Sequence, residues 1–438
     1  MKSSVWHPNT QMREWSSFDT ISKGKGIWLI DAKGNKIIDA VGSMWCNVWG
    51  HSNPQLVKAI TKQSKQIQHS SLFNLTNEPV ERLAKNLIKI SPGMNKVFYS
   101  DNGSSAMEIA IKMALQYWKN IGDTKKTQIA TIENGYHGDT FGAMSVGYVP
   151  EFFGKFKKQL FSTIQFPVPN EYRLPKGFTL SDYQNHCLEK IEKRFSKNND
   201  IAAFIMESGA QMAGGVIIYP KGFQKKISEL CKKYNILFVL DEIATGFGRL
   251  GSMVQYQDQK SIPDIVAYGK MLTGGYLTMA ATLANKKIYD SFSGDFNDWK
   301  HLFHGHTYTG NPIAAAVANE NLQMYEKHNL IKKVQKTSKI FENYSQEILD
   351  IDIVGDVRHK GMLMGIELVS NKKRKTPIRT KKSINKVFFE EGKKQGIYLR
   401  TLGNIVMLVP PLSIQENELE LLLKKTIKTI QIAKSKTF

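Results

Sequence analysis

The chain has 438 residues, of which 41% are hydrophobic and 23% charged, with a formal net charge of +21. This composition is typical of a globular protein with a large core, and no apolar run approaches the roughly 20 residues that span a bilayer. The three cysteines, Cys46, Cys187 and Cys231, are scattered, which argues against a disulfide framework or a zinc site and predicts a reducing, cytoplasmic setting.

The positive charge makes nucleic acid or an anionic membrane a partner to consider. The lysines are spread along the chain, however, and the cluster at 372–375 has no aromatic residues interleaved for base stacking. We therefore expect a lysine-rich solvated surface, with neither nucleic acid nor membrane as a partner.

The first 55 residues predict an irregular arm followed by a β-hairpin. Residues 1–20 show no regular periodicity. Two β-rich runs, 26–31 and 36–39, flank a glycine-containing turn, which is the pattern of a hairpin. The tryptophan-containing loop 41–51 that follows either packs into the core or walls a pocket.

Strand-like and helical patterns alternate from about residue 96 to residue 270, after helical patterns that open near 54 and 76. This alternation predicts an α/β fold with a mostly parallel, doubly wound sheet. Ligands bind such sheets at the carboxyl ends of the strands. We identify no chemistry in the proline-containing segment 150–200. The expected strands are 96–100, 128–132, 201–206, 236–240 and 265–267.

The strand at 96–100 runs into Gly103, Ser104 and Ser105 at the start of a helix. Backbone N–H groups and hydroxyls converge at such a helix N-terminus, where the helix dipole favours negative charge. We therefore expect these three residues to bind a phosphate group. The alternative is a plain serine N-cap.

Two charged residues follow apolar runs in the centre of the chain. Asp241 ends the run 236–240, and Lys270 follows 265–267 in a glycine-rich turn that lets the backbone approach a ligand closely. Pyridoxal phosphate needs a lysine that forms a Schiff base with its aldehyde and an acid near its pyridine nitrogen. This pair supplies both. The alternative is that Asp241 caps a helix and Lys270 is a solvated surface lysine.

The same stretch carries a family resemblance. The sequences DEIATGFGR at 241–249, PDIV at 263–266 and GK at 269–270 together resemble the signature of the class III aminotransferases, which are fold-type I pyridoxal-phosphate enzymes. The resemblance extends from about Trp6 to the C-terminal region. It implies a transaminase with a large domain, built on a mostly parallel doubly wound sheet, and a smaller α+β domain.

We expect residues 56–329 to form the large, cofactor-binding domain. Residues 1–55 are expected to belong with residues 330–438 to the small domain. The strand-like runs and the closing helix of the C-terminal part are expected at 357–368, 397–400, 405–412 and 416–432.

The resemblance implies roles for individual residues around the cofactor. Lys270 is the Schiff-base lysine and also moves protons, and Asp241 keeps the ring nitrogen protonated. Tyr136 stacks on the pyridine ring, where a flat aromatic side chain excludes water. We expect the adjacent His137 to be a structural histidine.

Further roles concern the substrate and a second subunit. Thr307 is expected to reach the phosphate of the neighbouring subunit, which implies a homodimer with composite active sites. Arg400 ends an apolar run where similar enzymes bind the substrate carboxylate, a task suited to a guanidinium fork; the alternative is a surface arginine. Glu207 and Gln211 match a pattern found near the cofactor hydroxyl and the substrate.

Within the family, the motifs at 6–12, 43–45, 135–140 and 304–307 are similar to those of the aminotransferases of biotin biosynthesis. This similarity implies conversion of 8-amino-7-oxononanoate to 7,8-diaminononanoate, with S-adenosylmethionine or lysine as the amino donor. Trp45 would line the pocket that holds the apolar chain of the acceptor. The substrate wall departs from the usual pattern at Asn9, where an aromatic residue is usual, and at Met44, where a second tryptophan is common.

Two alternatives remain. The first is an ω-aminotransferase for ornithine, 4-aminobutyrate or another diamine, against which the N-terminal Trp6-His7-Pro8 arm speaks. The second is a basic nucleic-acid-binding protein on a degenerate enzyme scaffold, against which the intact Asp241 and Lys270 speak.

Overall fold

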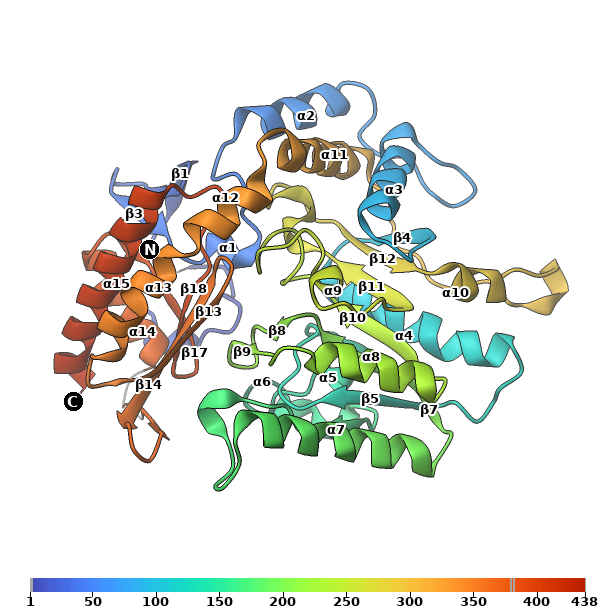
Figure 1. The fold of residues 1–438 in the computed structure, drawn as a ribbon. Coiled ribbons are helices and arrows are strands. Elements are labelled where there is room, and N and C mark those ends of the chain that lie inside the picture. Colours follow the sequence, from blue (N-terminus) through green and yellow to red (C-terminus); the bar gives the residue numbers. More distant parts are fainter. Residues whose placement is uncertain (1–2, 379, 381–382, 438) are drawn as a thin grey trace.

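The computed structural model describes residues 3–378, 380 and 383–437. Its centre is a seven-stranded sheet with the strand order β4-β12-β11-β10-β7-β5-β6 (Figure 1). Strand β12 runs antiparallel to both of its neighbours, whereas the pairs β10–β11, β10–β7, β5–β7 and β5–β6 are parallel. The strands are β4 (Lys96–Ser100), β5 (Gln128–Ile132), β6 (Ile164–Phe166), β7 (Ile201–Glu207), β10 (Leu237–Asp241), β11 (Ile265–Tyr268) and β12 (Ala280–Ala284).

The predicted mostly parallel sheet is confirmed, and the sequence missed two of its strands. Strand β6 spans only three residues inside the proline-containing segment 150–200, too few to show a period of two. Strand β12 is rich in alanine, which is depleted in strands. Pairing with distant strands determines both elements.

The strands of this sheet are buried on both faces. In β10, Leu237 and Val239 pack in one cluster with α4 (Gly103–Asn120). Phe238 and Leu240 point the other way, into the cluster that contains residues of α7 (Leu180–Lys197) and α8 (Phe223–Lys233). Successive side chains of a strand alternate between faces, so an uninterrupted apolar run fills two cores at once.

Three helices pack together above the sheet in Figure 1: α2 (Pro54–Ser64), α3 (Glu78–Ile90) and α11 (Pro312–Lys327). The start of α2 is set by Asn53, whose side-chain oxygen accepts hydrogen bonds from the backbone N–H groups of Gln55 and Leu56. Proline follows at the first helical position, where its missing N–H is not needed.

The N-terminal hairpin joins the C-terminal part of the chain. Strands β1 (Ile21–Lys25), β2 (Trp28–Asp31) and β3 (Lys36–Asp39) form a sheet with β16 (Ile397–Tyr398), which pairs parallel to β3. The predicted hairpin is confirmed. Figure 1 shows these blue strands beside the orange and red C-terminal helices. This pairing supports an association of residues 1–55 with residues 330–438, and the domain boundaries stay a prediction.

A second sheet, ordered β13-β14-β18-β17, lies in the C-terminal part. The run 357–368, expected as one strand, belongs to two antiparallel strands that turn at Gly361. Gly361 has a φ of +54°, and an added Cβ would lie 2.5 Å from the backbone of Leu250, so only glycine fits. The elements are β13 (Val354–Lys360), β14 (Leu363–Asn371), β17 (Arg400–Leu402), β18 (Ile405–Leu408), α13 (Ile340–Leu349), α14 (Ile384–Lys394) and α15 (Glu416–Thr437).

The remaining elements are short. They are α1 (Gly42–Trp45), α5 (Phe141–Val146), α6 (Pro150–Phe153), α9 (Gln255–Asp258), α10 (Lys286–Ser291), α12 (Leu330–Thr337), β8 (Ala210–Gln211), β9 (Ile217–Ile218), β15 (Thr376–Pro377), η1 (Met12–Glu14), η2 (Gly154–Gln159), η3 (Glu171–Arg173), η4 (Lys270–Thr273) and η5 (Phe296–Asp298).

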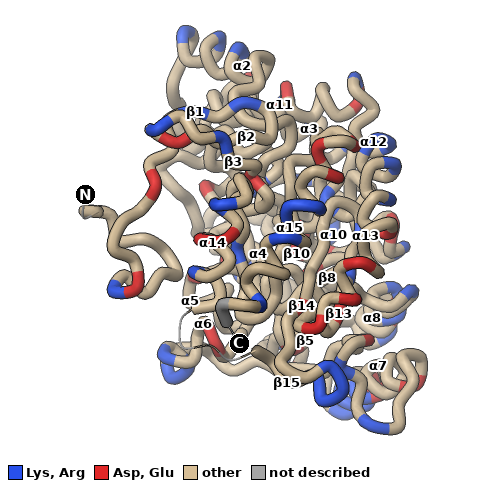
Figure 2. The backbone as a smooth tube through the Cα atoms, turned by 90° about the vertical axis from the view of Figure 1, so that its left-hand side faces the viewer, with Lys and Arg blue, Asp and Glu red and all other residues tan. Residues whose placement is uncertain are grey.

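Basic residues are distributed over the surface. Figure 2 shows lysine and arginine along most of the visible elements, with aspartate and glutamate among them. Among the described residues, no helix combines the length and apolar character that crossing a bilayer requires.

Candidate active site

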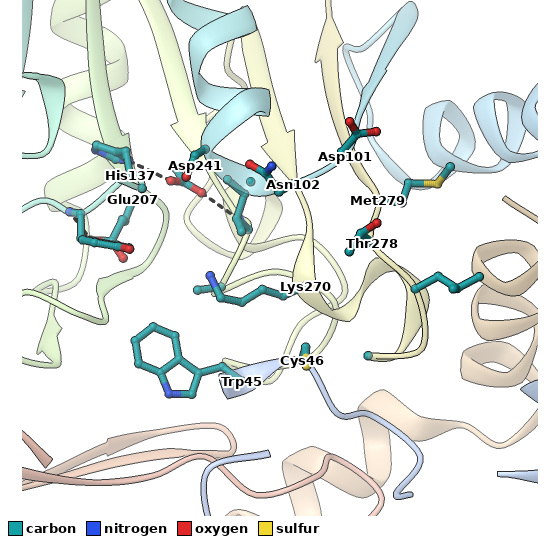
Figure 3. Close-up of a pocket in the computed structure, with 18 of the residues that line it drawn as sticks. Trp45, Cys46, Asp101, Asn102, His137, Glu207, Asp241, Lys270, Thr278 and Met279 are labelled. Atoms are coloured by element: carbon teal, nitrogen blue, oxygen red, sulfur yellow. Dashed lines mark hydrogen bonds and ion pairs between the residues drawn. The ribbon is translucent and has the colours of Figure 1, made fainter. Parts of the chain in front are cut away.

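The carboxyl ends of the central strands form the floor of a cavity of about 460 Å³ (Figure 3). Asp241 is the last residue of β10 and lies in register with Glu207 at the end of β7 and with Ala267 in β11. Only Gly269 separates Lys270 from the end of β11. The predicted carboxylate and amine therefore line the same cavity, as the topology of a parallel sheet requires.

Asp241 is held rigidly. Its Oδ2 accepts a hydrogen bond from Nδ1 of His137 at 2.8 Å, and its Oδ1 accepts one from the backbone N–H of Ile243 at 2.9 Å. The carboxylate and the imidazole are both buried. Because an ionised carboxylate only accepts hydrogen bonds, His137 donates from Nδ1, and this contact fixes the direction in which Asp241 faces the cavity.

Lys270 lies in a strained backbone conformation, with a φ of +43° that lysine rarely adopts. Its Nζ lies 5.5 Å from the centre of the Trp45 ring, and within the described part of the chain it has no salt bridge or hydrogen bond. Burial lowers the pKa of Lys270, and the nearby charges of Asp241 and Glu207 oppose that change. A buried amine with a lowered pKa is more often neutral and nucleophilic.

Glu207 borders the cavity beside Tyr136. The backbone N–H groups of Tyr136 and Met212 donate to its carboxylate at 3.2 and 3.0 Å. Burial nevertheless raises the pKa of Glu207 to about 7. The Tyr136 hydroxyl donates to Asp139 at 3.1 Å, and its ring stacks on Phe153 with ring centres 6.0 Å apart, so the aromatic face is fixed at the cavity wall.

The N-terminus of α4 opens on the same cavity through Gly103 and Ser104. The N-cap is Asn102, whose side-chain oxygen accepts from the N–H of Ser105 at 3.0 Å. The alternative of a serine N-cap is therefore wrong, and the N–H of Ser105 is already engaged. A Cβ on Gly103 would lie 2.8 Å from a methyl group of Ile243, so glycine is needed for this close approach.

These residues fit pyridoxal phosphate. A buried amine without a protein partner can condense with the aldehyde, and an oriented carboxylate can pair with the protonated ring nitrogen. The Tyr136 ring offers a flat face, and the N-terminus of an 18-residue helix offers N–H donors for the phosphate.

Arg400 lies in a neighbouring cavity of about 450 Å³, not in the cavity of Lys270. Met44 lines that second cavity, whereas Trp45, one residue further, lines the first. The Nε of Arg400 is buried and has no hydrogen-bond partner among the described residues. An unpartnered buried guanidinium nitrogen is available for an anionic ligand.

Two other predicted residues lie apart from Lys270. Asn9 is exposed, and its neighbours Pro8 and Thr10 line the second cavity instead. Thr307 is exposed in a loop, where its carbonyl oxygen lies 2.8 Å from a ring nitrogen of His69.

Sequence reasoning missed the role of His137, which was expected to be structural only. The signal available was its position in the motif Tyr136-His137-Gly138, after strand β5. The sequence also did not indicate that Cys46 and residues 275–279 line the cavity of Lys270, because these residues match no motif for catalysis or ligand binding.

The family described as aminotransferase class-III matches residues 11–430. The chain is 44% identical to the adenosylmethionine-8-amino-7-oxononanoate aminotransferase of Staphylococcus aureus, over 96% of this chain and 94% of that protein. It is 42% identical to the protein of that name from Methanocaldococcus jannaschii, over 95% of this chain and 94% of that protein.

Solved structures agree. The adenosylmethionine-8-amino-7-oxononanoate aminotransferase of Methanocaldococcus jannaschii matches with a TM-score of 0.92 and 40% identity, over 98% of this chain and 97% of that chain. The omega transaminase of Pseudomonas jessenii, in complex with PMP, matches with a TM-score of 0.94 and 29% identity, over 99% of this chain and 97% of that chain.

Proposed function

The chain belongs to the class-III aminotransferases, which are pyridoxal-phosphate enzymes, and on that premise we propose that it converts 8-amino-7-oxononanoate to 7,8-diaminononanoate in biotin biosynthesis, with S-adenosylmethionine as the amino donor. The observation that carries the proposal is the unpartnered Lys270 amine opposite the oriented Asp241, in a chain that matches enzymes of this name over nearly its full length.

The cofactor supplies an aldehyde that condenses with amines and a protonated ring that takes up electrons. Lys270 would hold the cofactor through Nζ and, once displaced by the donor amine, accept and return a proton at the same atom. Its lowered pKa favours the neutral amine that proton abstraction needs. Asp241, oriented by His137, would keep the proton on the ring nitrogen.

The rest of the cavity wall has supporting roles. Tyr136 would cover one face of the ring and exclude water, and the α4 N-terminus at Gly103 and Ser104 would bind the phosphate. Arg400 would bind the carboxylate of the acceptor in the second cavity, and Trp45 would pack along its apolar chain.

We also propose a homodimer with composite sites, in which Thr307 would reach the phosphate of the neighbouring subunit. The loops that carry residues 72–75 and 303–308 are adjacent, since Gly305 packs against Phe73. Both loops leave large apolar side chains in solvent, among them Phe73, Phe303 and Tyr308, which are 63%, 62% and 61% exposed. Exposed apolar side chains clustered in this way mark an interface, and a second copy docked here would receive Thr307.

The ω-aminotransferase alternative is not favoured, because the ω-transaminase structures share 28–29% identity with the chain, whereas enzymes named for 8-amino-7-oxononanoate share 34–44%. Nucleic acid is not proposed as a partner. We propose a cytoplasmic location, which the free Cys46, Cys187 and Cys231 support.

A donor screen tests this function. Purified protein with pyridoxal phosphate and 8-amino-7-oxononanoate is offered S-adenosylmethionine, lysine and ornithine in separate reactions, and the diamine product is measured. We expect product with S-adenosylmethionine. If only lysine yields the diamine, lysine and not S-adenosylmethionine is the donor. If no donor yields the diamine, the proposed acceptor is wrong.

A further inference from the structure

The segment α1 is a left-handed turn. Gly42, Ser43, Met44 and Trp45 have φ values of +52°, +47°, +69° and +74°. Ser43 and Met44 also have ψ values of 53° and 46°, which place them in the left-handed helical region. Residues with a Cβ visit this region singly and at an energetic penalty, so a succession of them requires a specific restraint from the surrounding structure.

Asp39 provides that restraint. It lies at the end of β3, its side chain is 0% exposed, and its Oδ2 accepts a hydrogen bond from the Ser43 hydroxyl at 2.7 Å. The same oxygen lies 3.0 Å from Nε2 of His51. A hydrogen bond to an ionised carboxylate is stronger than one between neutral groups, and burial strengthens it further.

Backbone contacts also restrain the turn. A Cβ on Gly42 would lie 2.7 Å from the carbonyl oxygen of Val409, so only glycine fits at position 42. The N–H groups of Trp45 and Cys46 then donate back to the carbonyl oxygens of Val41 and Gly42 at 2.9 and 3.1 Å. These hydrogen bonds exist only while the turn is closed.

The turn separates the two cavities of the proposed active site. Trp45 and Cys46 line the cavity of Lys270, and Ser43 and Met44 line the cavity of Arg400. An acceptor that presents its reacting carbon to Lys270 and its carboxylate to Arg400 must therefore pass this turn. The position of Trp45, 5.5 Å from the Lys270 amine, depends on the turn staying closed.

We propose that the Ser43–Asp39 hydrogen bond is a latch that keeps the turn 42–45 left-handed, and that Ser43 and Asp39 are thereby positioning residues that determine how the enzyme recognises its acceptor. The acceptor half of this inference rests on the proposed function. The latch itself does not, because it is a property of the chain without substrate.

The main test is Ser43→Ala, which removes the hydroxyl from an exposed side chain and leaves the core intact. We expect the KM for the acceptor to rise about tenfold, the factor that ~1.4 kcal/mol corresponds to, while kcat changes about twofold or less. The matched control is Ser22→Ala in β1, which belongs to the same sheet as Asp39; the Ser22 hydroxyl donates to the carbonyl oxygens of Ile30 and Asp31 at 3.3 and 3.2 Å. Its KM should equal that of the wild type.

A conservative variant separates the latch from a general packing effect. Asp39→Asn keeps an oxygen that accepts from Ser43 but loses the charge, so its acceptor KM should rise, by less than that of Ser43→Ala. The double variant with Ser43→Ala should be no worse than Ser43→Ala alone, because both changes act on one hydrogen bond. Independent, additive increases in KM would overturn the proposal.

Hydrogen exchange of the substrate-free protein gives the second readout. In Ser43→Ala the amides of Trp45 and Cys46 should exchange faster than in the wild type, and in Ser22→Ala they should not. Unchanged exchange in Ser43→Ala would overturn the latch. Faster exchange with an unchanged acceptor KM would overturn its role in recognition. If the wild type fails to convert 8-amino-7-oxononanoate, the proposed function fails, and the exchange result still decides whether the latch exists.

Discussion

The chemistry expected of Lys270 depends on its immediate surroundings. Its backbone is held at a positive φ after Gly269, its amine lies over Trp45, and its pKa is lowered by burial. The oriented carboxylate of Asp241 faces the same cavity. Other lysines have one of these features, such as the positive φ of Lys260 or the ring contact of Lys233, but Lys270 combines all of them in one cavity.

Lys270→Ala should abolish transamination, because no other amine lines this cavity among the described residues. Pyridoxal phosphate bound as a Schiff base gives a visible absorbance band that borohydride abolishes, and this band should be absent from the variant. Lys286→Ala is the control, since Lys286 lies exposed on α10 and its loss should change neither property. Substantial turnover by Lys270→Ala would refute the assignment.

Arg400→Ala should raise the KM for the carboxylate substrate roughly 10- to 100-fold, the loss expected for a hydrogen bond to a charged group. Arg400→Lys should fall between this variant and the wild type, because lysine keeps the charge and loses the planar fork. Steady-state kinetics with Arg374→Ala, an exposed arginine, serve as the control. An unchanged KM would remove Arg400 from the substrate site.

Glu207 makes stability depend on pH. Burial raises its pKa in the folded protein from 4.5 to about 7, so folding favours the protonated acid. The stability that Glu207 contributes is complete below about pH 4.5 and is lost as the pH rises through about 7. Glu207→Gln should therefore show a shallower fall in the free energy of unfolding over this interval than the wild type does.

The difference in slope is bounded by one proton, about 1.4 kcal/mol per pH unit. Urea unfolding at a series of pH values measures it. Glu151→Gln, at an exposed site, should keep the wild-type slope. Parallel curves for Glu207→Gln and the wild type would show that Glu207 is ionised at the same pH in the folded and unfolded chains.

At the scale of elements, strand β10 connects the core to the site. Its apolar side chains alternate between the two clusters on either face of the sheet, and its last residue is Asp241. Because the strand is fixed on both faces, its carboxyl end is a rigid mount for the carboxylate. Substitution of a buried apolar residue of β10 should therefore first lower the free energy of unfolding.

Leu240→Ala should lower the free energy of unfolding by about 2–5 kcal/mol, the range for removing a fully buried leucine and leaving a cavity. Denaturant unfolding measures the loss. Leu421 lies 38% exposed on α15, and Leu421→Ala should change stability far less. Equal effects of the two substitutions would contradict the two-faced burial of β10.

At the scale of the whole molecule, one chain does not bring Thr307 to its own Lys270 cavity. Thr307 lies in an exposed loop beside apolar side chains that solvent reaches. The proposed dimer accounts for both features, since the same contact would cover the apolar side chains and bring Thr307 to the phosphate site of the second subunit.

Mixed dimers test this arrangement. Lys270→Ala and Thr307→Ala are each expected to have low activity. Each variant lacks one of the two residues that different subunits would contribute to the same site. Unfolding and refolding an equal mixture should restore about a quarter of wild-type activity, because half of the dimers are hybrids with one intact site. Activity that stays at the mean of the separate variants would place Thr307 outside the partner's site.

The sequence by itself determined the parallel core strands, the hairpin and the Lys270–Asp241 pair. Each of these depends on a local pattern: an apolar run of strand length, a glycine-containing turn, or a charged residue directly after a buried strand. In a parallel sheet the carboxyl ends of neighbouring strands meet at one edge, so local order along the chain was enough to bring these two residues together.

Only the tertiary structure decided the contacts between distant parts of the chain. It inserted β12 antiparallel between β4 and β11, joined His137 to Asp241, and placed Arg400 in a cavity walled by the N-terminal arm. It also imposed the left-handed turn at 42–45. No short stretch of sequence encodes these features, because they are stabilised by partners that only the folded topology brings within reach.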